Sequence, residues 1–142
     1  MSSSDLVEIS VKKLLPTTSG FAVFMGPAEK TFVIYVGQDV GAAILMFQQK
    51  VKKPRPLTHD LIGRIFKSFE IKLERMVIND CHDGTFYAQL FLREENELGE
   101  KIVVIDARPS DCTALALQFS APIFVERKVL DQMEDVSHII IE

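Results

Sequence analysis

Two short stretches of the chain carry the same ingredients for starting a helix. Each combines an arginine, a proline, a hydroxyl residue and an aspartate: Arg55, Pro56, Thr58 and Asp60 in the first, Arg108, Pro109, Ser110 and Asp111 in the second. Proline presets φ for a first turn, a hydroxyl accepts from an unpaired backbone N–H, and aspartate suits the positive end of the helix dipole. We therefore expect helices to begin here. Capping leaves four polar residues unexplained: Arg55, His59, Arg108 and Asp106.

The residues before the first stretch alternate β-favouring runs with turns. Runs 6–15, 20–25 and 31–36 predict three strands of an antiparallel meander, and the apolar spacing of residues 39–51 predicts a helix. The first stretch then opens a helix with a basic wet face and one apolar stripe: Leu61, Ile62, Ile65, Phe66 and Phe69.

In the second half of the chain, the sequence pattern changes to the period of two that is typical of strands. Asp83 and Gly84 predict a hairpin between strands 75–79 and 85–93. The uninterrupted apolar run 102–105 predicts a central strand, and residues 109–119, apolar all round, predict a buried helix. These elements indicate an α+β fold in which antiparallel or mixed β-sheets pack with three main helices.

Composition predicts one domain. The 142 residues are 47% hydrophobic, enough for a single core, which we assign to residues 1–135. The apolar tail 136–142 is expected to add to a sheet edge or to contact another subunit. The first eight residues lack a basic start and an apolar stretch, and no run reaches the ~20 residues that span a bilayer. We expect a soluble, cytoplasmic protein without a membrane partner, whose Cys81 and Cys112 lack metal-type spacing.

The charge distribution points to a phosphate-bearing partner. The formal net charge is −4, yet residues 50–67 hold six lysines and arginines against one acid, Asp60. One basic patch on an acidic body is typical of a protein that binds phosphate at one place. A solvated linker followed by a lysine-rich helix face explains the same pattern.

Three strings, read in order, resemble the bifunctional nuclease domain family: residues 54–61, 84–88 and 105–111. The resemblance extends from about Leu6 to Leu130. It implies a homodimer with a groove in which phosphodiester bonds of DNA and RNA are cut. The chain departs from the family pattern at residues 38–41, where family members commonly carry glutamates and only Asp39 is charged here.

The residues of the two stretches supply the parts that phosphodiester cleavage needs. His59 is a candidate general acid or base because its intrinsic pKa lies near neutrality. Asp60, Asp106 and Asp111 are candidate ligands of a divalent cation, Mg²⁺ or Mn²⁺, and candidate catalytic residues with His59. Substrate phosphate is assigned to Arg55 and Arg108, with Thr58 and Ser110 beside them. The predicted partner is nucleic acid.

Simpler roles exist for the same residues. Arg55 with Asp111, or Arg108 with Asp60, would pin the two helix starts together as ion pairs. Thr58 and Ser110 suit helix caps better than nucleophiles. The alternative to a nuclease is a non-catalytic dimeric binding or regulatory module that captures a phosphate-bearing or acidic ligand.

Overall fold

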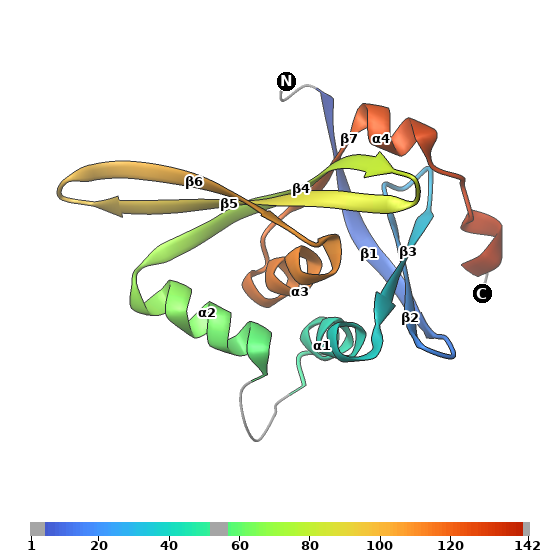
Figure 1. Ribbon diagram of the computed structural model, residues 1–142, viewed down its shortest axis with the longest axis horizontal. Coiled ribbons are helices and arrows are strands. Elements are labelled where there is room, and N and C mark those ends of the chain that lie inside the picture. The colour runs from blue at the N-terminus through green and yellow to red at the C-terminus, as the bar shows by residue number, and fades with distance from the viewer. Residues whose placement is uncertain (1–4, 52–56, 141–142) are drawn as a thin grey trace.

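The computed structural model describes residues 5–51 and 57–140, so Arg55 and Pro56 lie outside the described residues. The strands are β1 (Leu6–Pro16), β2 (Gly20–Gly26), β3 (Phe32–Gly37), β4 (Ile71–His82), β5 (Thr85–Asn96), β6 (Gly99–Ala107) and β7 (Ile123–Glu126). The helices are α1 (Gln38–Gln49), α2 (Thr58–Ser68), α3 (Pro109–Phe119), α4 (Arg127–Gln132) and the 3-10 helix η2 (Ser137–Ile140). Within these ranges the strands form one mixed seven-stranded sheet in the order β3-β2-β1-β7-β4-β5-β6 (Figure 1). The predicted α+β class is confirmed.

β1 joins the two halves of the sheet. Its first residues, Leu6–Ile9, pair antiparallel with β7, and Ser10–Pro16 pair antiparallel with β2. β2 pairs antiparallel with β3, which confirms the predicted meander. β7 runs parallel to β4, so this four-residue strand lies in the middle of the sheet.

The hairpin between β4 and β5 forms where the Asp-Gly pair predicts it. Asp83 and Gly84 have φ values of 51° and 79°. Positive φ at both central residues belongs to the hairpin turns whose twist matches that of the strands. The turn thereby sets the register next to it, His82↔Thr85, and irregularities at residues 78–80 and 73–75 of β4 shift the register before Ile71↔Glu94.

Helices α1, α2 and α3 lie on one side of the sheet (Figure 1), and α3 packs between α1 and α2 against β4 and β5. The prediction that α3 is buried is confirmed, since Cys112, Ala114 and Ala116 are fully buried. Burial raises the pKa of the Cys112 thiol to about 12, so this cysteine is a neutral packing residue. Cys112 and Cys81 are both free thiols. In the described ranges, no helix is long and apolar enough to cross a membrane.

Two apolar surfaces predicted to be buried are exposed. β6 is an edge strand and not a central one, and its run Ile102–Ile105 is open to solvent, with Ile102 58% exposed. On α2, Ile62 and Phe66 pack on the core, whereas Leu61, Ile65 and Phe69 are exposed. The free ends of β5 and β6 extend past α2 (Figure 1). An uninterrupted apolar run therefore does not distinguish a strand buried in its own chain from one left open at an edge.

The described part of the tail, residues 136–140, contains a 3-10 helix and no edge strand, and its contact with another subunit stays a prediction. Val136 is buried with Ala22 and Phe24, and its N–H donates to the Thr31 carbonyl at 2.7 Å. Residues 137–140 form η2, whereas residues 141–142 lie outside the described residues. Within the described range the tail is a 3-10 turn docked beside β2.

Candidate functional site

The start of α2 uses its aspartate as a cap. The N-cap is Leu57, whose apolar side chain accepts no hydrogen bond, and Asp60 occupies the third helical position. Asp60 Oδ2 accepts from the Leu57 N–H at 2.8 Å. This backward reach satisfies a donor at the helix end. Thr58, at the first helical position, is not the cap, so the prediction of a threonine cap is wrong.

The start of α3 uses the equivalent aspartate for side-chain contacts. Arg108 is the N-cap, Pro109 is the first helical residue, and no side chain caps the helix. Asp111, again at the third position, accepts from Arg108 Nε at Oδ2 (2.8 Å) and contacts His59 Nε2 at Oδ1 (2.9 Å). Ser110 is therefore not the cap that the sequence predicted. The contact between His59 and Asp111 links α2 to α3.

α2 also packs closely on the C-terminal end of α3. A Cβ on Gly63 would lie 2.0 Å from Gln118 Nε2 and 3.1 Å from Phe119 Cζ. The rings of Phe66 and Phe119 pack beside this contact, with centroids 5.9 Å apart. Gly63 thus lets α2 pack closely on the C-terminal end of α3, where the nearest atom is the end of the flexible Gln118 side chain.

The predicted ion pairs form differently. Arg108 pairs with Asp111 of its own helix start and not with Asp60, and the contact between the helices is made by His59. The other predicted pair, between Arg55 and Asp111, lies outside the described residues. The helix starts are joined through one shared carboxylate.

The shared carboxylate is ionised. Burial raises the pKa of Asp111, but hydrogen bonds from Arg108 and His59 outweigh it and hold that pKa below its usual value. The same bond to Asp111 raises the pKa of Arg108. An ionised carboxylate only accepts, so His59 donates from Nε2–H. His59 is 7% exposed, which keeps its ring fixed in the wall of the site.

A cleft of about 810 Å³ opens at these residues. Its polar lining comes from the first turns of three helices: Asp39 of α1, Thr58 and His59 of α2, and Arg108 and Asp111 at the start of α3. The apolar lining includes Met46, Phe66 and Leu115. Helix starts expose backbone N–H groups and the positive ends of helix dipoles. The cleft thus combines a polar rim, which includes two carboxylates, with apolar walls.

Three of the predicted site residues that the structure describes do not line the cleft: Asp60, which caps α2, Asp106 and Ser110. Asp106 pairs with Gln89 in the sheet, and its neighbours Ile105 and Ala107 line the cleft. Because side chains alternate along a strand, Asp106 points to the opposite face of the sheet. Ser110 lies against β2, β3 and Thr113, outside the cleft. The sequence places Asp106 beside Arg108 but does not reveal that the sheet separates them.

The three predicted metal ligands, Asp60, Asp106 and Asp111, do not form one cluster. In the described part of the chain, no three His, Cys, Asp or Glu side chains group closely enough to hold one. Asp60 caps α2, Asp106 faces away, and both Asp111 oxygens are engaged by His59 and Arg108. At sites that bind phosphate, Mg²⁺ keeps several waters and commonly takes only one or two carboxylates together with substrate oxygens. A divalent cation at these residues therefore stays a prediction.

Asp39 is a cleft residue that the sequence analysis did not select as a site residue. It stands in the first turn of α1 and lines the cleft with His59 and Arg108. The sequence offers one signal for it, because Asp39 is the charged residue left where family members carry acids. Its contribution to the cleft comes from the packing of α1 on α3, which no local motif reveals.

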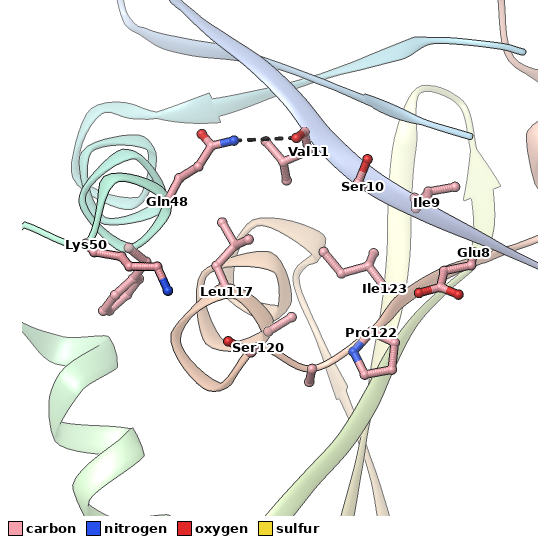
Figure 2. A pocket seen from close by; sticks show the side chains of 13 residues that line it. Glu8, Ile9, Ser10, Val11, Gln48, Lys50, Leu117, Ser120, Pro122 and Ile123 are labelled. Carbon is pink, nitrogen blue, oxygen red and sulfur yellow. Dashed lines mark hydrogen bonds between the residues drawn. The ribbon is translucent and has the colours of Figure 1, made fainter. Parts of the chain in front are cut away.

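A second cavity, of about 420 Å³, lies at the other ends of α1 and α3 (Figure 2). Lys50 and Glu8 stand on opposite sides of it, and Gln48 Nε2 donates to the Val11 carbonyl at 3.4 Å. None of the predicted site residues that the structure describes lines this cavity. Among the described residues, the predicted site residues that come together do so in the first cleft.

Comparison with known proteins supports the family seen in the motifs. The chain is 42% identical, over 99 residues, to the uncharacterized proteins MT1877 and Rv1829 of Mycobacterium tuberculosis (strains CDC 1551 / Oshkosh and ATCC 25618 / H37Rv). The match includes 70% of this chain and 56% of each relative, so the chain spans about half the length of these relatives. The sequence model of the family "Bifunctional nuclease domain" matches residues 23–137, most of the chain. The chain belongs to the bifunctional nuclease domain family.

Proposed function

We propose that the protein is a nuclease that cleaves phosphodiester bonds of nucleic acid in the cleft between α1, α2 and α3. The single observation that carries the proposal is the bridge of His59 and Arg108 by Asp111 at the rim of this cleft. A fixed imidazole supplies proton transfer, and a guanidinium supplies positive charge where negative charge gathers. Membership in the family supports the same reading.

Phosphate binding is supported by the helix starts. The first turns of α1, α2 and α3 all line the cleft, and Arg108 keeps its side chain 71% exposed beside them. Arg108 uses Nε for Asp111, which leaves its Nη groups as donors for phosphate oxygens. Thr58 adds a hydroxyl to the same rim. Lys67 and Arg64 on the exposed face of α2 supply further positive charge for a nucleic-acid strand.

We also propose a homodimer. The edge strand β6 exposes Ile102–Ile105, and α2 exposes Leu61, Ile65 and Phe69. An apolar edge strand left open is a site for pairing with another chain. Measurement of mass in solution tests this, with a dimer expected for the wild type and a monomer for the double variant Ile102→Lys, Val104→Lys. A monomeric wild type at high protein concentration would contradict the proposal.

Binding without cleavage is the second candidate function, and one observation favours it. Both oxygens of Asp111 already have partners, so His59, Arg108 and Asp111 also suit a purely structural bridge. In that case phosphate-bearing ligands bind in EDTA and no turnover occurs with any cation.

The deciding experiment is nuclease assay of the purified protein on single-stranded RNA and DNA, with Mg²⁺, with Mn²⁺ and with EDTA. We expect cleavage that co-elutes with the protein and is lost in Asp111→Asn. Equal cleavage by wild type and Asp111→Asn would show that the activity belongs to a contaminant or to another site.

A further inference from the structure

The cleft reaches the free edge of the sheet. Its lining includes Ile105 and Ala107 of β6, and β6 is the last strand of the sheet. Ile105 is also 41% exposed, so one residue belongs both to the cleft wall and to the open edge. A strand that pairs with β6 therefore stands beside the cleft.

A second copy of this chain is the occupant that suits the edge. The run Ile102–Ile105 is apolar and exposed throughout, so two copies of it cover each other's apolar surface when they pair. Pairing about a two-fold axis perpendicular to the sheet makes the two β6 strands antiparallel. Residues that stand opposite each other then point to the same face of the continuous sheet.

The charges on β6 distinguish between the two registers that centre the apolar run. Because opposite residues share a face, the axis passes through a residue, either Val103 or Val104. An axis at Val103 would set Asp106 against Glu100 of the partner subunit, and two carboxylates directly opposite each other are unfavourable. An axis at Val104 sets Asp106 against the partner's Ile102, so the structure favours this register.

This register brings a lysine to the cleft wall. β6 pairs with β5 without a bulge, so its side chains alternate strictly, and the exposed Lys101 lies on the face of Ile105 and Ala107. With the axis at Val104, the partner's Lys101 stands opposite Ala107. With the axis at Val103 it would stand opposite Ile105, which also lines the cleft. Neighbouring strands lie about 4.8 Å apart, within the reach of a lysine side chain.

We propose that Lys101 of the partner subunit completes the cleft and contacts the phosphates of bound nucleic acid, an inference that rests on the proposed nuclease function and homodimer. Each dimer then has two clefts, and each cleft is built from both chains. The ends of β5 and β6 that extend past α2 (Figure 1) lie along the end of the partner's β6 in this arrangement. The reach of these two strands past α2 is what carries the lysine to the other subunit.

The charge of Lys101 complements the rim of the cleft. Among the described residues, the rim holds two carboxylates, Asp39 and Asp111, against one arginine, Arg108, which pairs with Asp111. Nucleic acid brings a negative charge with each phosphate, and its binding depends on cations beside them. A lysine ammonium donates to phosphate oxygens of DNA and RNA alike. The inference therefore agrees with the cleavage of both that the family resemblance implies.

A simpler role for Lys101 lies within its own chain. Glu94 of β5 stands opposite Lys101, on the same face of the sheet. Opposite charges at such positions stabilise a sheet without any part in binding. In this role Lys101 acts on its own subunit, whereas in the proposed role it acts on the other one.

The interface is tested first, without a measurement of activity. Val104→Cys, in a Cys81→Ser background, places two thiols about 5 Å apart at the axis, so a short bifunctional maleimide should link the chains into a dimer. Leu98→Cys in the same background is the control, because Leu98 is 96% exposed but its two copies would lie about 40 Å apart. Equal linking of both variants, or of neither, would overturn the interface.

The contribution of Lys101 is tested with a mixed dimer, purified through a different affinity tag on each chain. One chain carries Lys101→Gln and the other Asp111→Asn. If Lys101 acts across the interface, one cleft is intact, and the mixed dimer should cleave at about half the wild-type rate. The Lys101→Gln homodimer should be about tenfold slower than wild type. Lys128→Gln, which removes an exposed charge on α4, is the matched control and should keep the wild-type rate.

The outcomes separate the inference from the proposed function. A mixed dimer no faster than the Lys101→Gln homodimer, or a Lys101→Gln homodimer with the wild-type rate, would overturn the inference and leave the protein a nuclease. A wild type that cleaves nothing would overturn the nuclease function. Binding of a labelled oligonucleotide in EDTA then replaces cleavage, and a mixed dimer that binds no more tightly than the Lys101→Gln homodimer would overturn the inference. A thermal unfolding curve shows that each variant is folded.

Discussion

The starts of α2 and α3 place an aspartate at the same helical position and use it for different purposes. Asp60 reaches back to the N–H of Leu57, whereas Asp111 reaches outward to His59 and Arg108. The N-cap residue explains the difference. Leu57 offers a backbone donor alone, while Arg108 adds a guanidinium, a stronger partner for a carboxylate. The helical position of an aspartate therefore does not determine its role, because neighbouring donors compete for its carboxylate.

The largest effect is expected at Asp111. Asp111→Asn weakens the charge-assisted bonds to His59 and Arg108 together, so the cleavage rate should fall about 100-fold or more. Single-turnover cleavage of a labelled oligonucleotide measures this. A rate within about threefold of wild type would remove the distinction between the two helix starts, because both aspartates would then be structural.

A large side chain at Gly63 should lower both the stability and the cleavage rate. Gly63→Leu forces a side chain against Gln118 and Phe119, which should lower the free energy of unfolding by about 1–3 kcal/mol and separate His59 from Asp111. Denaturant unfolding and the cleavage rate are measured together. Gly37→Ala is the matched control, because a Cβ there meets nothing within 4 Å. Full activity in Gly63→Leu would show that the approach of the two helix starts is not needed.

Asp60 should matter for stability alone. Asp60→Ala removes the cap of α2 and should lower the free energy of unfolding by about 1 kcal/mol. Urea unfolding checks this value, and cleavage assayed where the variant is fully folded should stay within about threefold of wild type. A loss of activity as large as that of Asp111→Asn would instead place Asp60 in the cleft chemistry.

The smallest effect is expected in the dependence of the unfolding free energy on acidic pH. The pKa of Asp111 is lowered in the folded protein, so its contribution to stability is fully present above the unfolded value of about 4 and is lost as pH falls through the folded pKa. The difference in unfolding free energy between wild type and Asp111→Asn should be constant from about pH 5 to 7 and shrink below about pH 4. A difference that does not change down to pH 2 would contradict the lowered pKa.

Local signals predicted much of the fold. The turn at Asp83 and Gly84, the start of α3 at Pro109 and the meander of β1 to β3 each depend on residues close in sequence, and each is confirmed. The position of β7 in the middle of the sheet was not predictable, because a four-residue strand carries no record of its partners β1 and β4.

The site was predictable in part. His59, Arg108 and Asp111 were selected because capping did not explain them or because they stood in the motif, and the structure brings them together. Asp106 was misplaced because alternation turns it to the other face of the sheet, and Asp39 was not selected because its place depends on how α1 packs. Contacts between distant segments decided both cases.

The wrong prediction for β6 also arose from contacts that the local sequence does not reveal. Its apolar run has the composition of a buried strand, yet it lies at the edge of the sheet in a single chain. The proposed homodimer reconciles the two, since a second copy would cover what one chain leaves open. In that case the prediction of burial is wrong for the single chain and right for the assembly.

The most direct test of the account is a double-mutant cycle on the cleavage rate with His59→Gln, Asp111→Asn and the two combined. If His59 and Asp111 act as one unit across the two helix starts, the double variant will be about as slow as the slower single variant. If the two losses multiply, the residues act independently and the shared carboxylate is not the centre of the site.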